Sequence, residues 1–597
     1  MTTSPETSEP TRRADVTEDA GHPTLSDALR HWARTQGDRC AVTFVDYRVR
    51  DAGMATSMTW RTLDARVDAV AAWCQRRAVR GDRVAVLVDQ SLDYVVAFLG
   101  ALRAGLVAVP LFEPTPLPGH DERLAAVLTD CAPSLVLTAR RHGDAIERFL
   151  TRRGLSGPRI VAVDVVPLVS GHDYDPVPLR PDDIAYLQYT SGSTRAPAGV
   201  MITHANVVAN ARQGMASYGC EQALTTSVSW LPLFHDMGLV LGLVSPVHGG
   251  FPATLMDPLA FLARPRRWLE RLAATRGPVV TAAPNFAYGY TASRTTEAER
   301  AALRLDHVVA LGDGSEPVLP STLDTFYEAF ADCGLHPRMH RHTYGLAEAV
   351  VLVSVSSAGS PPARVSLDRT ALAAGRAEVV APGVGSALTL VSAGQAVGQE
   401  IRIVDPKTAT TVPSGHVGEI WVSGPNVGVG YWGREEDTRH VFAAQLRDAE
   451  GGIVEPWPER PGWLRTGDLG VLVDGDLYIT GRQKDLIIVD GHNHYPQDLE
   501  YTVEQAHPAV RRHAVAAFSV PGDEGEQVVV VAERARQLAA GDLDVADVAA
   551  VVRASVSQRH GLALRDVVLI GPGGLPRTSS GKIQRSACRI RYVERSF

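Results

Sequence analysis

Short apolar segments alternate with helical segments over roughly the first 350 residues, and this alternation constrains the fold more than any other feature. Arg83–Val88 and Val107–Leu111 have the length and apolar content of buried strands, and Leu92–Arg103 between them has the length of a helix. Apolar side chains then recur at helical spacing over residues 124–131, before the strand-like Leu135–Thr138. Strand–helix–strand units place successive strands parallel, with helices on both faces of the sheet. We therefore predict an α/β fold.

The rest of the chain divides into a strand-rich part and a small mixed part. Between Val384 and Tyr478 the sequence favours strands with Gly/Pro turns, such as Glu419–Val422. A smaller α+β unit follows, with helices expected at 496–505 and 545–560 and strands at 514–520, 527–532 and 566–570. We predict a disordered tail at 1–22, a large domain at 23–481, a hinge at 482–485 and a small mobile C-terminal lid domain at 486–597.

Composition excludes several classes of function. The 59 basic and 67 acidic residues give a net charge of −8, which implies no general affinity for nucleic acid. The six cysteines are scattered without a CxxC pair, which favours a reducing compartment over a disulfide or zinc framework. The longest apolar stretch, Tyr94–Phe112, is interrupted by Arg103, Gly105 and Pro110, so no membrane span is expected. We expect a cytoplasmic protein.

A run rich in hydroxyl groups and glycine follows the strand-like segment 184–187. Backbone N–H groups and hydroxyls in such a loop can grip a polyphosphate, because glycine lets the backbone turn inward without a Cβ clash. The run is not a Walker loop, since GxxxxGK[ST] is absent. Standing alone, it would equally well be a surface turn. The residues that we expect to contact phosphate are Thr190, Ser191, Gly192, Ser193 and Thr194.

Lysine is rare in this chain. Only Lys407, Lys484 and Lys582 are lysines, so 59 − 3 leaves 56 arginines. Lys582 lies in a Ser/Gly-rich segment, Leu575–Ile583, near the C-terminus. An ammonium group carried by a mobile loop can offset negative charge where it builds up in a reaction. A solvated surface lysine is the alternative explanation.

Three further motifs contain candidate site residues. Tyr344 and Glu348 stand four positions apart in Tyr-Gly-Leu-Ala-Glu, Asp468 ends the segment 463–468, and His235 lies in the largely apolar segment 231–239. Each motif alone would equally well be a turn, a helix cap or a structural histidine. Together with residues 190–200 and the Lys582 segment, they resemble the acyl-adenylate-forming superfamily of AMP-binding enzymes. The resemblance covers nearly the whole chain, from about residue 25.

The resemblance implies an ATP- and Mg²⁺-dependent ligase in which a carboxylate attacks the α-phosphate and displaces pyrophosphate. It implies that Lys582 stabilises charge between the two anions, that His235 contacts the acyl carboxylate with Asp236 positioning it, and that Glu348 holds Mg²⁺ and takes part in catalysis. The residues that it assigns to the nucleotide are Thr190 to Thr194, Gly314, Ser315, Tyr344, Gly345, Leu346, Ala347, Asp468 (ribose) and Arg482. Asp313 stands where the family pattern leads us to expect Asn, which weakens a side-chain role there.

Two features resemble the fatty acyl-AMP ligase branch. Arg195 and Ala198 stand where the wider superfamily usually has Gly and Lys. The segment Ser356–Gly398, which includes 365–369, resembles an insertion that hampers the lid rotation needed for reaction with CoA. This branch passes a medium or long acyl group to the phosphopantetheine thiol of an acyl carrier protein or domain, typically of a polyketide or nonribosomal peptide synthase.

Two alternatives remain open on sequence alone. One is a fatty acyl-CoA synthetase that uses free CoA, in which the extra residues form a decorative loop. The other is a catalytically silent protein that binds acyl groups or nucleotides. The motifs at Thr190–Thr194, Glu348 and Lys582 are intact, which argues against the silent protein.

Two other patterns are rejected as sites. Gly428–Gly433 fits GxGxxG, but it lies in the strand-rich part with no strand–helix–strand unit after it. His492 and His494 have metal-like spacing, but no third ligand is evident nearby.

Overall fold

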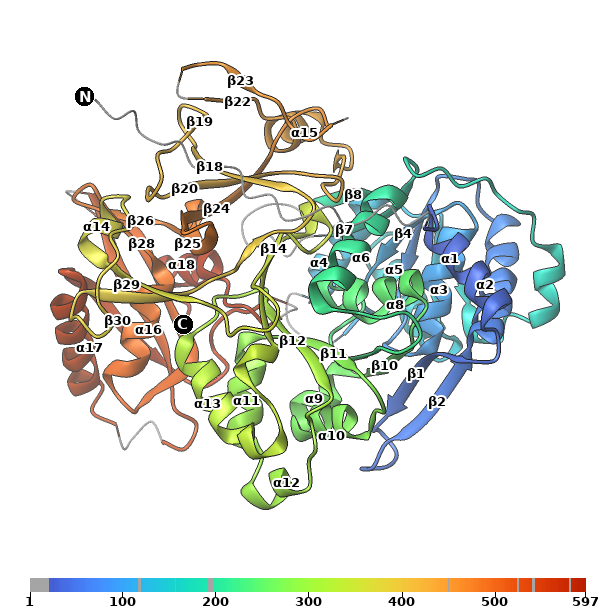
Figure 1. Ribbon diagram of the computed structural model, residues 1–597, viewed down its shortest axis with the longest axis horizontal. Helices are drawn as coiled ribbons and strands as arrows, with labels where there is room; N and C mark the ends of the chain where they lie inside the picture. The colour runs from blue at the N-terminus through green and yellow to red at the C-terminus, as the bar shows by residue number, and fades with distance from the viewer. Residues whose placement is uncertain are drawn as a thin grey trace.

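The computed structural model describes residues 21–115, 120–155, 157–189, 197–448, 450–458, 460–522, 525–538, 543–578 and 581–597 (Figure 1). Two mixed sheets and their helices form the N-terminal half of the molecule. A strand-rich part and a small C-terminal α+β part lie beside them. The α/β class predicted from the strand–helix alternation is confirmed.

One sheet has the strand order β21-β8-β7-β4-β3-β5-β6. Its strands are β3 (Arg83–Val86), β4 (Val107–Pro110), β5 (Leu135–Thr138), β6 (Arg159–Ala162), β7 (Ile184–Tyr189), β8 (Gly199–Thr203) and β21 (Gly430–Tyr431). β3 to β7 run parallel, as predicted. Apolar side chains of α2 (Trp60–Gln75) and α3 (Leu92–Arg103) belong to the core on one face. Those of α4 (His120–Cys131) and α5 (Gly143–Arg152) belong to the core on the other.

One element in this sheet differs from the prediction. Gly199 and Val200, which we placed in the polar loop, begin β8, which pairs antiparallel with β7. The segment 199–203 is apolar and partly β-branched, which suits a strand, but it is too short to distinguish from a loop end without its partner. Thr203 then caps α6 (His204–Tyr218) through a reciprocal pair of hydrogen bonds with Asn206.

The second sheet has the strand order β17-β14-β13-β12-β11-β9-β10-β1-β2. Its strands are β1 (Cys40–Asp46), β2 (Met54–Thr59), β9 (Thr226–Ser229), β10 (Ala253–Met256), β11 (Val279–Pro284), β12 (Val308–Gly314), β13 (His340–Tyr344), β14 (Ser354–Val355) and β17 (Gln395–Ala396). A core shared with the first sheet includes α6 and α8 (Ser245–Gly249). A second core includes α10 (Arg266–Ala274), α11 (Asn285–Arg294) and α13 (Pro320–Phe330).

The strand-rich part forms a third sheet of order β23-β22-β19-β18-β20-β24-β25. Its strands are β18 (Glu400–Asp405), β19 (Thr410–Thr411), β20 (Gly418–Ser423), β22 (Leu446–Arg447), β23 (Ile453–Val454), β24 (Leu464–Val473) and β25 (Asp476–Arg482). A helix, α15 (Glu435–Phe442), interrupts the strands. Asp468, in the middle of β24, accepts a hydrogen bond from Tyr344 of β13, which joins the third sheet to the second.

The C-terminal part has its own hydrophobic core. It consists of α16 (Pro496–Ala506), β28 (Val510–Gly522), β29 (Gly525–Arg534), α17 (Val545–His560), β30 (Leu564–Ile570) and α18 (Arg585–Val593). The helices and strands predicted here are confirmed, with β28 longer than expected. Among the described residues, no helix is both long and apolar enough to cross a membrane.

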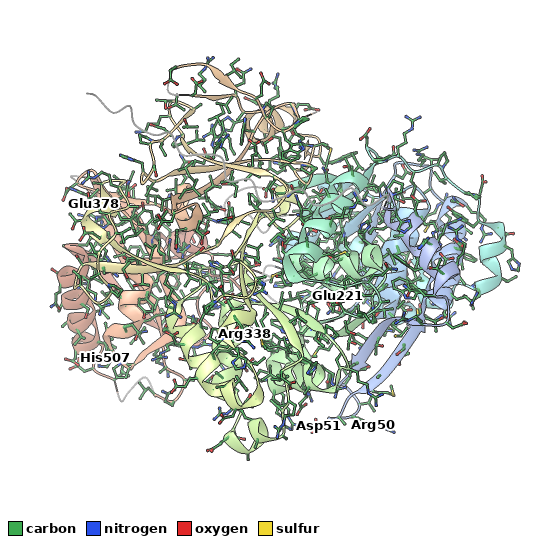
Figure 2. All side chains as sticks on the ribbon, in the orientation of Figure 1. Arg50, Asp51, Glu221, Arg338, Glu378 and His507 are labelled. Carbon is green, nitrogen blue, oxygen red and sulfur yellow. The ribbon has the colours of Figure 1, made fainter. Side chains whose placement is uncertain are left out.

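Figure 2 draws the side chains in the orientation of Figure 1, with Arg50 and Asp51 between β1 and β2 and His507 in the C-terminal part.

Candidate functional site

A cavity of about 3180 Å³ lies where the two mixed sheets, the third sheet and the C-terminal part meet. The ends of parallel strands border it, which is the usual position of a ligand site in an open α/β sheet. The predicted residues that line it are His235, Ser315, Tyr344, Gly345, Leu346, Ala347, Glu348, Asp468, Arg482 and Lys582. Gly314 is buried directly before Ser315, at the end of β12. Thr190 to Thr194 lie outside the described residues.

Asp468 joins three parts of the site. Its Oδ2 accepts a hydrogen bond of 3.0 Å from the Tyr344 hydroxyl, and its Oδ1 lies 3.0 Å from Nε of Arg482. Asp468 and Tyr344 are buried, whereas the Arg482 side chain is 53% exposed, so solvent screens the Tyr344 contact less than the Arg482 contact. The ends of β13 and β25 and the middle of β24 therefore meet at one carboxylate.

Glu348 stands on a short helical turn, Ala347–Ala349, at the edge of the same cavity. The Tyr431 hydroxyl donates to Oε1 of Glu348 at 2.8 Å, and the Gly428 N–H donates to the Glu348 carbonyl at 2.8 Å. Burial raises the pKa of the Glu348 carboxyl, and the Tyr431 hydrogen bond opposes that rise. A nearby cation would favour the charged form of this carboxylate.

The donor set fits Mg²⁺ bound jointly with a nucleotide. Within the described ranges, no three His, Cys, Asp or Glu side chains form a group able to hold a metal by themselves. Mg²⁺ commonly uses one or two carboxylates together with substrate phosphates, and Glu348 supplies such a carboxylate. His492 and His494 lie on one short strand, β27 (His492–His494), of a separate hairpin.

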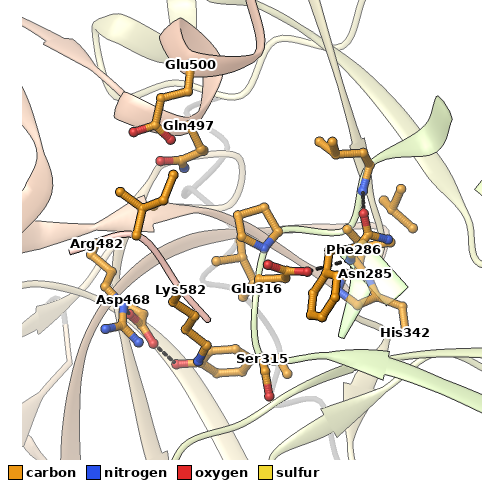
Figure 3. A pocket seen from close by; sticks show the side chains of 18 of the residues that line it. Asn285, Phe286, Ser315, Glu316, His342, Asp468, Arg482, Gln497, Glu500 and Lys582 are labelled. Atoms are coloured by element: carbon orange, nitrogen blue, oxygen red, sulfur yellow. Dashed lines mark hydrogen bonds and ion pairs between the residues drawn. The ribbon is translucent and has the colours of Figure 1, made fainter. Parts of the chain in front are cut away.

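Lys582 reaches the cavity from the C-terminal part (Figure 3). The Thr578 N–H donates to the Lys582 carbonyl at 2.8 Å, and the Lys582 N–H donates to Oγ1 of Thr578 at 3.1 Å, which fixes the loop. Burial lowers the pKa of the Lys582 ammonium, and the charge of Arg482 lowers it further. Asp236, Glu316 and Asp468 act in the opposite direction. The ammonium thus lies among carboxylates from separate segments.

His235 and Asp236 form a close pair, with Nδ1 of His235 2.6 Å from Oδ1 of Asp236. Burial alone would raise the pKa of Asp236. The charge and hydrogen bond of His235, the charge of Lys582 and the Met237 N–H outweigh burial and lower it. Asp236 therefore stays ionised beside His235 and orients the imidazole.

Three cavity residues were not singled out from the sequence. Glu316 accepts a hydrogen bond of 2.6 Å from the Phe286 N–H, and burial raises the pKa of its carboxyl to about 7.

Tyr431 lies in the rejected GxGxxG run. Nothing in the sequence around Tyr431 indicates that its hydroxyl bonds to Glu348. Glu419 accepts hydrogen bonds from the Gly467 N–H and the Arg465 guanidinium, and so fixes the turn before Asp468. The sequence does contain one indication of the role of Glu419: it is a carboxylate within an apolar strand, and a buried charge needs a partner.

Asp313 lies behind the cavity rather than in its wall. It is fully buried, and its Oδ2 accepts a hydrogen bond of 2.7 Å from Nδ2 of Asn285, which does line the cavity. Burial raises the pKa of the Asp313 carboxyl well above its ordinary value. Its contribution to the site is through the position of Asn285.

The segment 356–398 contacts the C-terminal part directly. It contains β15 (Arg364–Asp368), α14 (Arg369–Ala373) and β16 (Ala387–Val391). Arg369 forms a bidentate ion pair with Asp498 of α16. The distance from Nε to Oδ2 is 2.7 Å, and the distance from Nη2 to Oδ1 is 3.0 Å. Both side chains are largely buried, at 13% and 7% exposed.

Comparisons with known proteins agree with this geometry. Residues 29–432 match the family described as AMP-binding enzyme, and residues 484–597 match the Disco-interacting protein 2-like AMP domain. The chain is 42% identical to the long-chain-fatty-acid–AMP ligase FadD32 of Mycolicibacterium smegmatis, covering 95% of this chain and 94% of that protein. It is 42% identical to the 4-hydroxyphenylalkanoate adenylyltransferase of Mycobacterium marinum, with 96% and 92% covered.

A solved structure is similar over the same length. A structure from studies of fatty acyl-adenylate ligases of E. coli and L. pneumophila shares 32% sequence identity and superimposes with a TM-score of 0.83. The match covers 96% of this chain and 98% of that one.

We predict that Gly345→Ala disables the site. A Cβ at this position would lie 1.5 Å from the Val351 carbonyl oxygen, a backbone atom, so the segment between Tyr344 and Glu348 must shift. A shift of about 1 Å costs roughly a hundredfold in rate, measured here as ATP–pyrophosphate exchange. Gly143→Ala is the control, since nothing lies within 4 Å of its Cβ position. Normal exchange by Gly345→Ala would contradict the site geometry.

Proposed function

The chain belongs to the AMP-binding enzyme family and is a fatty acid–AMP ligase that forms an acyl-adenylate, and from this premise we propose how its residues divide the work and where the acyl group goes. The observation that carries the proposal is the convergence of Lys582 with Asp236, Glu316, Asp468 and Arg482 around one cavity. Site residues from the large and C-terminal parts of the chain are thus assembled in one place.

In the proposed reaction, a carboxylate oxygen of the fatty acid forms a bond to the α-phosphorus of ATP. The bond from that phosphorus to its bridging oxygen breaks, and pyrophosphate leaves. Lys582 provides positive charge to both anions as they approach, which lowers the electrostatic barrier. His235, oriented by Asp236, contacts the acyl carboxylate.

Other residues hold the nucleotide. We assign the adenine to Gly314, Ser315 and the segment Tyr344–Ala347, and the ribose hydroxyls to Asp468. Arg482, which is paired with Asp468, is also assigned to the nucleotide. Glu348 would hold Mg²⁺, which when bound neutralises phosphate charge. Thr190 to Thr194 are proposed to donate to the phosphates.

We propose that the acyl group passes to the phosphopantetheine thiol of a carrier protein or domain rather than to free CoA. The resemblance implies that reaction with free CoA follows a rotation of the C-terminal lid about the hinge 482–485. The buried Arg369–Asp498 contact ties the insertion to α16, so rotation must break it. Apolar side chains of the insertion also pack with Tyr495, next to α16. These contacts favour the carrier-loading branch over an acyl-CoA synthetase.

Lys582→Ala is predicted to lower acyl-adenylate formation by about two to three orders of magnitude, because a preorganised charge at the reacting atoms is lost. ATP should still bind, since Asp468, Arg482 and the Tyr344 segment are unchanged. Lys407→Ala is the matched control, because Lys407 is an exposed lysine of the third sheet. Unaltered turnover by the Lys582 variant would remove this residue from the mechanism.

We predict that the double variant Arg369→Gln/Asp498→Asn forms acyl-CoA from free CoA. The double change removes the contact without leaving a buried charge unpaired, so the protein should fold. Mass spectrometry of reactions with free CoA measures the product. The control, Arg364→Gln, breaks an exposed pair of the same insertion with Asp324 and should form no acyl-CoA. A double variant that makes acyl-AMP but no acyl-CoA would show that this contact does not decide the branch.

A further inference from the structure

Apolar residues that follow His235 in the chain belong to the wall of the large cavity, and we call the part of the cavity beside them the limb. Met237, Val240 and Leu241 follow His235 on one helical face and line the limb. Asn210, Gly214 and Tyr218 line the limb from one face of α6. Since His235 is assigned to the acyl carboxylate in the proposed function, this limb is where the acyl chain extends.

A second, small cavity lies directly behind the limb. It measures about 20 Å³ and shares Gly214, Tyr218 and Leu241 with the limb as a common wall. A volume of this size holds one water-sized group. At Gly214 the wall is thin, because a Cβ placed there would meet only Oγ of Ser245, at 3.8 Å.

Hydroxyl groups line the small cavity, and three of them have partners. Ser227 Oγ donates to the Leu241 carbonyl at 2.9 Å, Ser229 Oγ accepts from the Leu231 N–H, and Thr281 Oγ1 accepts from Nε1 of Trp268. Ser245 Oγ is buried and has no hydrogen-bond partner among the described residues. An unpaired buried hydroxyl is costly unless a ligand or water satisfies it.

Ser245 directly follows an irregular turn of the helix. Residues 240–244 form a π-helical turn, in which the Ser245 N–H bonds to the Val240 carbonyl. A helical serine can bond to the carbonyl four residues earlier, here that of Leu241. Ser227 Oγ donates to that carbonyl, and Ser245 Oγ makes no hydrogen bond to it. π-helical turns occur frequently at functional sites, and this one leaves the Ser245 hydroxyl facing the small cavity.

We infer that the small cavity is an end-pocket for the far end of the acyl chain, and that it takes a chain whose terminus carries a hydroxyl group. Gly214 provides the opening, and Ser245 hydrogen-bonds the terminal hydroxyl. A terminal methyl group at the same depth leaves the Ser245 hydroxyl without a hydrogen-bond partner. This inference rests on the proposed function of the limb, and it assigns Gly214 and Ser245 as specificity-determining residues.

The test compares fatty acids with their ω-hydroxy analogues over a series of chain lengths, by kcat/KM for acyl-adenylate formation. At the length that reaches Ser245, the wild type should prefer the ω-hydroxy acid by about tenfold, the effect of one hydrogen bond. At shorter lengths the preference should vanish. In Ser245→Ala the ratio should fall to about one, because the partner hydroxyl is gone.

Two further variants complete the design. Ser217→Ala should keep the preference, because its hydroxyl bonds to the Gln213 carbonyl on the same helix and does not line the small cavity. Gly214→Ala should abolish the preference, because its Cβ fills the opening while suiting the helix. Normal adenylation with no ω-hydroxy preference at any length, or a preference that survives Ser245→Ala, overturns the end-pocket alone. Adenylation of neither acid overturns the proposed function as well.

Discussion

The site depends on the carboxylate of Asp468, which binds Tyr344 and Arg482 at once. These three residues come from strands that belong to two different sheets, and Arg482 ends the last strand before the C-terminal part. Because Asp468 is buried, solvent screens its hydrogen bond to Tyr344 weakly, and this bond links the two sheets beside the cavity that Lys582 also lines.

Opposite charges surround the two cations that the C-terminal end of the third sheet and the C-terminal part bring to this cavity. Lys582 and Arg482 bring two cations beside Asp236, Glu316 and Asp468. Their repulsion is offset by these carboxylates, and the phosphates of ATP would add further negative charge between them. The Arg369–Asp498 pair also lines the cavity, and it joins the segment 356–398 to α16 through residues other than Lys582 and Arg482.

Much of the fold could be predicted from the sequence, because the alternation of apolar strands and helices is local. Leu135–Thr138 and Val545–His560 are found where their patterns predict them. β8 was missed because a five-residue strand gives little signal without its partner β7. Within the site, the motif residues around Tyr344 and Lys582 were recognised as short runs. The partners of Tyr431 and Arg369 could not be predicted, because Glu348 lies 83 residues from Tyr431 in the chain and Asp498 lies 129 residues from Arg369.

The most direct test of the account is the product distribution of the purified protein. It would be incubated with ATP, Mg²⁺, a fatty acid, free CoA and a carrier protein bearing phosphopantetheine, and the products resolved by mass spectrometry. The account predicts acyl-AMP and acylated carrier protein with no acyl-CoA. Abundant acyl-CoA would contradict it, because the lid would then rotate freely past the insertion.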